Sequence, residues 1–211
     1  MEKKLLKGTT TVGLTYKDGI VMATEHRATM GTLIAHKKTQ KLFRITEHLG
    51  LTTAGLVGDA QVLARYLRAE AELYALKRNT PITVRAASTL MANILNARKY
   101  YPYWVQLIIA GVDDEGGHVY SLDAAGGSIP DTYVTTGSGS PYVYGVLEDH
   151  FKENMTKKDT VDLAIRGITA AMKRDAASGN GIDVATISQK AGWNWISGEE
   201  IEKRISAMGL K

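Results

Sequence analysis

The sequence of 211 residues contains no cysteine, which excludes both disulfide bonds and thiolate chemistry. Its five histidines are scattered, and no two lie four residues apart as zinc ligands on one helix do, so we expect no metal site and no cofactor. No apolar run approaches the roughly 18 residues that cross a membrane, and Met1–Gly8 lacks the apolar core of a secretory signal. We therefore expect a cytoplasmic protein that does not enter a membrane.

The chain also lacks a large excess of one charge, because it has 26 lysines and arginines and 22 acidic residues, which gives a formal net charge of +4. The basic residues are interspersed with acidic ones and form no patch, so we do not expect nucleic-acid binding. Hydrophobic residues make up 44% of the sequence, which is enough for a sizeable core. No repeat, low-complexity tract or long linker divides the chain, so we expect a single domain.

Apolar residues that alternate or run without a break predict strands, and apolar residues spaced three and four apart predict helices. The expected strands are Thr10–Tyr16, Ile20–Glu25, Leu42–Ile45, Leu49–Leu56, Val105–Val112, His118–Leu122, Ile182–Gln189 and Trp193–Ile196. The first expected helix follows Gly58, with Asp59 as its N-cap, and is broken at Pro81. The other expected helices are Val84–Lys99, Ser140–Phe151, a stretch from the capping residue Thr156 to about Ala177, and Glu199–Met208.

Connections of hairpin length join most neighbouring strands, which favours antiparallel sheets. The runs Ile20–Ala23 and Leu107–Ala110 are apolar at every position, as is typical of a sheet that is covered on both faces. Two stacked sheets with helices outside each satisfy both observations. We therefore predict an α+β fold arranged as a four-layer αββα sandwich of two antiparallel sheets flanked by helices.

The peptide bond between Gly8 and Thr9 is the most informative place in the sequence. If this bond is cut, Thr9 gains a free α-amine beside its own hydroxyl, so the nucleophile and its general base lie on one residue. A free α-amine titrates at about 7.7–8.0, close to the pH at which a base is most effective. The alternative is simply a threonine-rich first strand, because β-branched residues favour strands.

Glu25 and Lys41 are charged residues in positions that the strand pattern marks as inward-facing. By two-residue alternation, Glu25 shares a face with Ala23, and Lys41 shares a face with Phe43. A lysine that points inward needs a carboxylate partner or a lowered pKa, and both are common at catalytic sites. The alternative is a lysine at the mouth of a strand that reaches solvent.

Asp175 and Ser138 lie next to the ends of predicted helices. Asp175 falls in the last turn of its helix, where the helix dipole disfavours a carboxylate, so we expect it to have a cationic or amine partner. Ser138 lies in the loop Gly137–Pro141, immediately before a helix. This loop fits an ordinary helix N-cap, a catalytic loop or a phosphate-binding loop, although it lacks the GK[ST] ending of a nucleotide-binding loop.

Seven short motifs occur in a fixed order along the chain. They are Gly8–Gly13, Ala23–Glu25, Lys41–Phe43, Ala54–Asp59, Asp123–Gly127, Thr136–Ser140 and Arg174–Gly179. Together they resemble the ordered landmarks of a 20S proteasome β-subunit, most closely of the archaeal type. Each motif is weak by itself, but their joint order from Thr9 to Leu210 is highly specific.

This resemblance implies a threonine peptidase of the N-terminal-nucleophile class, in which Thr9 is the nucleophile. Lys41 would lie beside the Thr9 hydroxyl, and Glu25 would hold Lys41 as its ionic partner, where the family often has aspartate. The backbone N–H of Gly55 would face the developing oxyanion. The residues implied to orient the Thr9 amine are Ser138, Asp175 and Ser178.

The family also implies which residues form the pocket for the side chain before the scissile bond. These are Ala28, Thr29, Thr39, Thr53 and Val57. Because they are small or apolar and none is charged, we expect a chymotrypsin-like preference for apolar or aromatic side chains.

The resemblance further implies that residues 1–8 are a propeptide removed by autocatalytic cleavage, which leaves 9–211 as one N-terminal-nucleophile hydrolase domain. Seven copies would form a ring stacked on rings of a homologous α-subunit, and an ATPase would deliver unfolded protein substrates. Neither a metal nor a nucleotide takes part in this chemistry. Two rival interpretations are a non-catalytic ring subunit, which should lack the Thr9, Lys41 and Asp175 set, and the simpler two-ring bacterial threonine peptidase or another amidohydrolase of this class.

Overall fold

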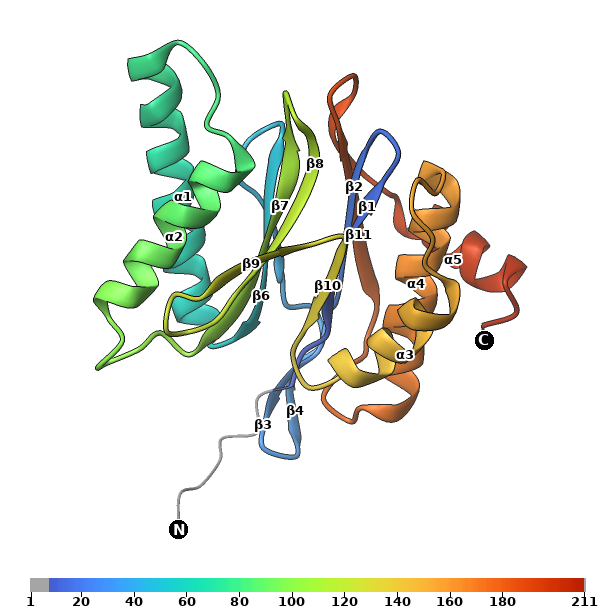
Figure 1. Ribbon diagram of the computed structural model, residues 1–211. Coiled ribbons are helices and arrows are strands. Elements are labelled where there is room, and N and C mark those ends of the chain that lie inside the picture. The colour runs from blue at the N-terminus through green and yellow to red at the C-terminus, as the bar shows by residue number, and fades with distance from the viewer. Residues whose placement is uncertain (1–7, 211) are drawn as a thin grey trace.

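The computed structural model describes residues 8–210, which form four layers: helices, a sheet, a second sheet and helices (Figure 1). Sheet one has the strand order β10 (Tyr133–Thr136), β1 (Thr11–Tyr16), β2 (Gly19–Glu25), β11 (Ile182–Ser188) and β12 (Gly192–Trp195). Sheet two has the order β5 (Leu42–Arg44), β6 (Leu49–Gly55), β7 (Val105–Asp113), β8 (Gly116–Leu122) and β9 (Ser128–Asp131). All of these neighbouring strands pair antiparallel, so the predicted α+β sandwich is confirmed.

Two groups of helices cover the outer faces of the two sheets. Sheet two is covered by α1 (Val57–Arg78) and α2 (Val84–Ala97). Sheet one is covered by α3 (Ser140–His150), α4 (Lys157–Arg174) and α5 (Gly198–Ala207). Within residues 8–210, no helix is both long and apolar enough to span a membrane.

The helix ends confirm one predicted cap and correct another. The Thr156 hydroxyl caps α4 by accepting a hydrogen bond from the N–H of Asp159 at 3.2 Å, as the sequence predicts. The prediction that Asp59 caps α1 is wrong, because α1 starts at Val57 and its N-cap residue is Leu56. Asp59 instead accepts a hydrogen bond from the N–H of Trp104 at 2.9 Å, which ties the first turn of α1 to the start of β7.

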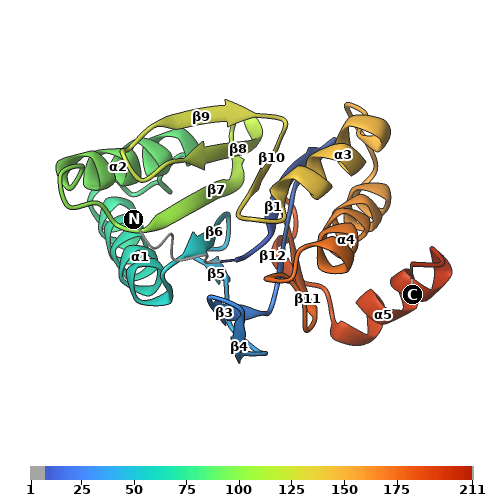
Figure 2. The same ribbon diagram turned by 90° about the horizontal axis from the view of Figure 1, so that it is seen from below.

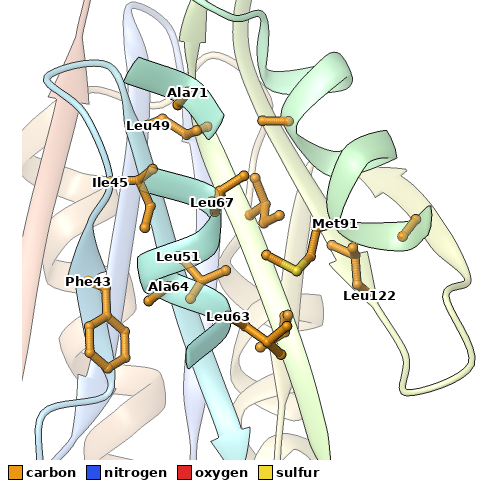
Figure 3. Packing of buried hydrophobic residues seen from close by; sticks show 14 of the residues in the cluster. Phe43, Ile45, Leu49, Leu51, Leu63, Ala64, Leu67, Ala71, Met91 and Leu122 are labelled. Atoms are coloured by element: carbon orange, nitrogen blue, oxygen red, sulfur yellow. The ribbon is translucent and has the colours of Figure 1, made fainter. Parts of the chain in front are cut away.

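Three hydrophobic clusters hold the layers together. The first lies between sheet two and its helices, where Leu63 and Leu67 of α1 and Met91 of α2 face Leu49 and Leu51 of β6 (Figure 3). The second lies between sheet one and helices α3 to α5. The third fills the space between the two sheets, and its members include Met22, Ile108 and Trp193. Strand β2 is buried at every position, as its unbroken apolar run predicts.

Leu51→Ala is expected to lower the free energy of unfolding by about 2–5 kcal/mol, because it removes a fully buried side chain and leaves a cavity that the packed layers only partly close. Leu76→Ala is the matched control, since Leu76 is 83% exposed. We expect its effect to stay within about 0.5 kcal/mol. Urea unfolding of the isolated subunit measures both, and equal effects of the two substitutions would contradict the assignment of Leu51 to the core.

Four short strands lie in segments where the sequence analysis expects none. The hairpin of β3 (Ala28–Met30) and β4 (Leu33–His36) stands apart from both sheets (Figure 2). Strands β9 and β10 have four residues each and form edges of the two sheets. Strand β9 is largely exposed and contains Pro130, which an edge strand tolerates, whereas β10 is mostly buried but is too short to show a clear period.

Candidate active site

The antiparallel register of sheet one brings three distant segments to the same end of the sandwich. Thr11 of β1 lies opposite Thr24 of β2 on one side and Thr136 of β10 on the other. The residues just beyond these pairs, Thr9, Glu25 and Ser138, therefore gather at one end. The β3–β4 hairpin projects from this same end (Figure 1).

Thr9 is almost completely buried, at 5% exposure, and directly precedes this register. Its hydroxyl donates a hydrogen bond of 2.6 Å to the carbonyl oxygen of Gly8, which belongs to the peptide bond that the sequence analysis singles out. The N–H of Thr9 donates a hydrogen bond of 3.2 Å to Ser138 Oγ. Gly8 and Thr9 are still joined, so the nitrogen of Thr9 is here an amide and not an amine.

Gly8 is seated against the loop that follows α4. A Cβ at position 8 would overlap the Cβ of Ala177 and would lie 2.8 Å from its Cα and 3.1 Å from Ser138 Oγ. Because real Cβ atoms essentially never approach so closely, only glycine fits here without a shift of the loop. The backbone of Gly8 also donates a long hydrogen bond of 3.4 Å to Thr29 Oγ1.

Lys41 and Glu25 form a buried ion pair that joins the two sheets. Lys41 directly precedes β5 of sheet two, and Glu25 ends β2 of sheet one. Burial lowers the pKa of the Lys41 ammonium, and the adjacent Glu25 carboxylate partly opposes this effect. Both predicted features, a carboxylate partner and a lowered pKa, are therefore present together, and the alternative of a lysine that reaches solvent is wrong.

The Glu25 carboxylate is satisfied from several sides. Its Oε1 accepts from Lys41 Nζ and from the N–H of Thr10 at 3.2 Å. Its Oε2 accepts from the N–H of Arg27 at 2.6 Å and from the N–H of Gly179 at 2.9 Å. Lys41 Nζ also donates to the carbonyl oxygen of Arg27. Among the described residues, these two bonds are the hydrogen bonds of Lys41 Nζ, and neither reaches the Thr9 hydroxyl.

A network of hydroxyl groups lies on the other side of Thr9. Asp175 Oδ2 accepts hydrogen bonds of 2.6 Å from both Ser138 Oγ and Ser178 Oγ. Because the single proton of Ser178 is directed to Asp175, the 2.6 Å bond between Thr10 Oγ1 and Ser178 Oγ must be donated by Thr10. The network therefore runs from the N–H of Thr9 through Ser138 to Asp175, and from there through Ser178 to Thr10.

This network corrects two expectations for Asp175 and Ser138. Asp175 follows α4 as its C-cap residue and does not lie in the last turn, and its direct partners are two hydroxyls and the N–H of Ala177 instead of a cation or an amine. The expected amine exists only after the Gly8–Thr9 bond is cut, so the amine partner of Asp175 stays a prediction. Ser138 is not the N-cap of α3, since that position belongs to Gly139, and its hydroxyl is directed to Asp175.

A cavity of 240 Å³ opens beside Gly8 and Thr9. Seven of the predicted site residues line it, namely Thr9, Ala28, Thr29, Lys41, Thr53, Gly55 and Val57. Thr39 is not among the lining residues, and its N–H donates to the carbonyl oxygen of His26 at 2.9 Å. The lining residues that the sequence analysis did not name are Ala35, His36, Gln40, Leu56, Gly58 and Ala60.

Gly55 ends β6 at the wall of this cavity with a φ of +132°, a backbone conformation that side chains disfavour. A Cβ at this position would also clash with the carbonyl group of Trp104. The backbone of Gly55 therefore reaches the cavity uncovered by any side chain. Within residues 8–210, no group of three or more His, Cys, Asp or Glu side chains could hold a metal ion.

Three residues take part in the site without having been named as site residues by the sequence analysis: Thr10, Arg27 and Gly179. Thr10 and Gly179 lie within motifs that the analysis quotes, so their positions were available although their roles were not. Arg27 follows the end of β2 and gives no periodic signal, because its contacts depend on a loop about 150 residues further along the chain.

Comparison with known proteins shows the family to which this chain belongs. A family model described as "Proteasome subunit" matches residues 5–187. The chain is 54% identical over 204 residues to the proteasome subunit beta of Methanothermobacter thermautotrophicus, with 97% of each chain covered. It is 54% identical over 210 residues to the proteasome subunit beta of Thermoplasma acidophilum, with 100% of this chain and 99% of the relative covered. It is 52% identical over 207 residues to that of Archaeoglobus fulgidus, with 98% of this chain and 97% of the relative covered. The chain therefore belongs to the proteasome subunit family, and within it to the β-subunits of the archaeal type.

Proposed function

We propose that this chain is a proteolytic subunit of a proteasome core particle and hydrolyses peptide bonds with Thr9 as its nucleophile. The observation that supports this most is the position of the Thr9 hydroxyl. It lies at a cavity that Lys41 also lines, with the buried Lys41–Glu25 pair on one side and the Asp175 network on the other. An unactivated hydroxyl is a poor nucleophile, so groups that accept or stabilise its proton are what this chemistry requires.

Lys41 is the group suited to receive the proton of the Thr9 hydroxyl. The pKa of its ammonium is lowered by burial, which reduces the cost of its neutral form and brings it closer to the operating pH. Glu25 fixes its position and stabilises the cation that forms when the proton arrives. Three backbone N–H groups hold the Glu25 carboxylate in turn, so the pair is preorganised.

Cleavage of the Gly8–Thr9 bond would use the same hydroxyl. Thr9 Oγ attacks the carbonyl carbon of Gly8, an ester forms, and the Thr9 nitrogen leaves as an amine once it has gained a proton. Water then splits the ester, which releases residues 1–8 and restores the hydroxyl. The hydrogen bond between the Thr9 hydroxyl and the Gly8 carbonyl already brings the reacting groups together.

The released amine of Thr9 would then act as the general base for substrate hydrolysis, and Lys41 would shuttle the proton of the hydroxyl to it or stabilise the charge that develops. The amine would lie where the N–H of Thr9 now lies, within hydrogen-bond distance of Ser138 Oγ. Ser138 and Ser178 both donate to Asp175, so the amine would join this network. A substrate carbonyl is attacked by Thr9 Oγ, the amine of the leaving peptide departs, and water assisted by the Thr9 amine hydrolyses the ester. The N–H of Gly55 is proposed to stabilise the oxyanion, a type of contact whose loss costs about 10²–10³ in rate.

Substrate preference and assembly follow from the same proposal. The cavity beside Thr9 has small and apolar walls, among them Ala28, Ala35 and Val57, which suits a chymotrypsin-like preference for apolar or aromatic side chains. The relatives are proteasome subunits. We therefore propose a cytoplasmic particle in which seven copies form a ring between rings of an α-subunit, and unfolded proteins reach it from an ATPase.

Gly8→Ala is expected to slow the release of residues 1–8 strongly, because its Cβ would overlap that of Ala177 and push the scissile carbonyl away from the Thr9 hydroxyl. Intact mass measured over time on assembling particles gives the cleaved fraction. Gly8→Ala combined with Ala177→Gly removes the overlapping atom, and we expect it to recover part of the rate. Unchanged cleavage in Gly8→Ala would contradict the close packing of Gly8 against Ala177.

The experiment that tests the proposal directly is the intact mass of this chain after co-assembly with its α-subunit. Loss of residues 1–8 means that a Thr9 amine exists and the proposed mechanism can operate. A full-length mass in assembled, peptidase-inactive particles would overturn the proposal and favour a non-catalytic ring subunit.

A further inference from the structure

The loop 176–181 connects α4 to β11 and carries two parts of the site. Ser178 Oγ donates to Asp175, and Ala177 packs against Gly8. No helix or strand includes this loop, and its backbone has positive φ values of 70° at Asn180 and 128° at Gly181. Its position must therefore be set by contacts with other parts of the chain.

The side chain of Arg27 supplies such contacts on both sides of Ser178. Its Nη1 donates a hydrogen bond of 2.7 Å to the carbonyl oxygen of Ala176, and its Nε donates one of 2.8 Å to Asn180 Oδ1. Between these two points, the guanidinium lies so close to the backbone of Gly179 that a Cβ there would be 2.6 Å from Arg27 Cζ. The planar fork of the guanidinium thus spans the loop from residue 176 to residue 180.

The backbone of Arg27 contacts the other half of the site. Its N–H donates to Glu25 Oε2 at 2.6 Å, and its carbonyl oxygen accepts from Lys41 Nζ. One residue therefore touches both the buried ion pair and the loop that holds Ser178. Arg27 is not among the residues that line the cavity, so its influence on Thr9 passes through these neighbours.

We infer that Arg27 is a positioning residue for the proposed peptidase reaction, holding the Ser178 loop in place relative to the Lys41–Glu25 pair. This inference rests on the proposed function of Thr9. The backbone contacts of Arg27 survive substitution by alanine or lysine, so these changes remove the two side-chain bonds to the loop and leave the ion pair formed. The loop keeps its backbone bonds to Glu25 and His26, so we expect a displacement of the loop and not its unfolding. The side chain is therefore the part that an experiment can isolate.

Arg27→Ala is expected to lower kcat for a short fluorogenic peptide by about 10–100-fold, since a displacement of about 1 Å in a catalytic group can cost about 10² in rate. KM should stay within about twofold, because Arg27 does not touch the cavity. Arg27→Lys keeps the charge but cannot bridge both acceptors, so we expect it to recover only part of the loss. Rates are normalised to the fraction of chains that intact mass reports as cleaved.

Asn180→Gly tests the same contact from the loop side. Glycine accepts the φ of 70° at this position, so this variant removes only the acceptor of the Arg27 Nε bond. We expect kcat to fall less in Asn180→Gly than in Arg27→Ala. Because Arg27→Ala already removes this bond, the double variant should have the same kcat as Arg27→Ala alone. If Arg27→Ala does not assemble, kcat of Asn180→Gly relative to wild type still decides the inference.

Arg44→Ala is the matched control, because Arg44 is exposed and its side chain pairs with Glu47 outside the site. Wild-type kcat in Arg27→Ala or Asn180→Gly, or a loss carried by KM instead of kcat, would overturn the inference while leaving the proposed function intact. Failure of the proposed function has a different signature, in which wild type and Thr9→Ala hydrolyse the peptide equally, and that result would overturn both.

Discussion

Thr9→Ala is expected to abolish both release of residues 1–8 and peptidase activity, with hydrolysis falling by about 10⁴-fold or more. The reason is that the variant removes the hydroxyl that attacks in both reactions, and no cysteine is present to replace it. Thr9 Oγ makes its hydrogen bond to the Gly8 carbonyl, so the fold should lose little when this atom is removed. Intact mass and hydrolysis of a fluorogenic peptide by assembled particles measure the two losses.

Thr9→Ser is the control for this prediction, since it keeps the hydroxyl and loses only a methyl group. We expect it to be cleaved after Gly8 and to retain peptidase activity. If Thr9→Ala still lost residues 1–8 in purified particles, the cut would have to come from another protease, and the autocatalytic part of the proposal would be wrong.

Lys41→Ala is expected to lower peptidase activity by about 10²–10⁴-fold without unfolding the subunit. Removing one partner of a buried ion pair usually costs about 3–5 kcal/mol, because a charge is left uncompensated. Here Glu25 keeps hydrogen bonds from the backbone N–H groups of Thr10, Arg27 and Gly179, so we expect the lower end of that range. Peptide hydrolysis and urea unfolding of the same preparation separate the two effects.

Lys38→Ala provides the matched control, because Lys38 lies three residues earlier and is exposed. It should leave both activity and unfolding unchanged. Turnover close to wild type in Lys41→Ala would remove Lys41 from the proposed mechanism, whatever the stability of the variant.

The layers of the fold could be predicted from the sequence because burial leaves a periodic pattern. The unbroken apolar run of β2 and the three- and four-residue spacing of α1 both arise because each element packs against the layers beside it. The β3–β4 hairpin could not be predicted in this way, since β4 is exposed at every position and pairs only with β3. For the same reason Ala35 and His36 were missed as lining residues of the cavity.

Individual site residues were predictable where their placement conflicted with simple packing. Lys41 and Glu25 stood out as charges in apolar strands, and their ion pair resolves both conflicts. Asp175 stood out for a similar reason, but the two serine hydroxyls that donate to it could not be identified from periodicity, because they lie in loops. The place of Arg27 in the sequence does not conflict with packing, so the sequence gives no sign of its role. That role depends on side-chain contacts with residues 176 and 180.

The division of the site between the two sheets links its chemistry to the completion of folding. Thr9 and Glu25 belong to sheet one, whereas Lys41 and Gly55 belong to sheet two, and the ion pair forms only when the sheets are packed together. Under the proposed mechanism, a partly folded chain therefore has a Thr9 hydroxyl without its proton acceptor and is expected to be unreactive. If cleavage after Gly8 is autocatalytic, as proposed, a chain can acquire its Thr9 amine only after its two sheets have packed together.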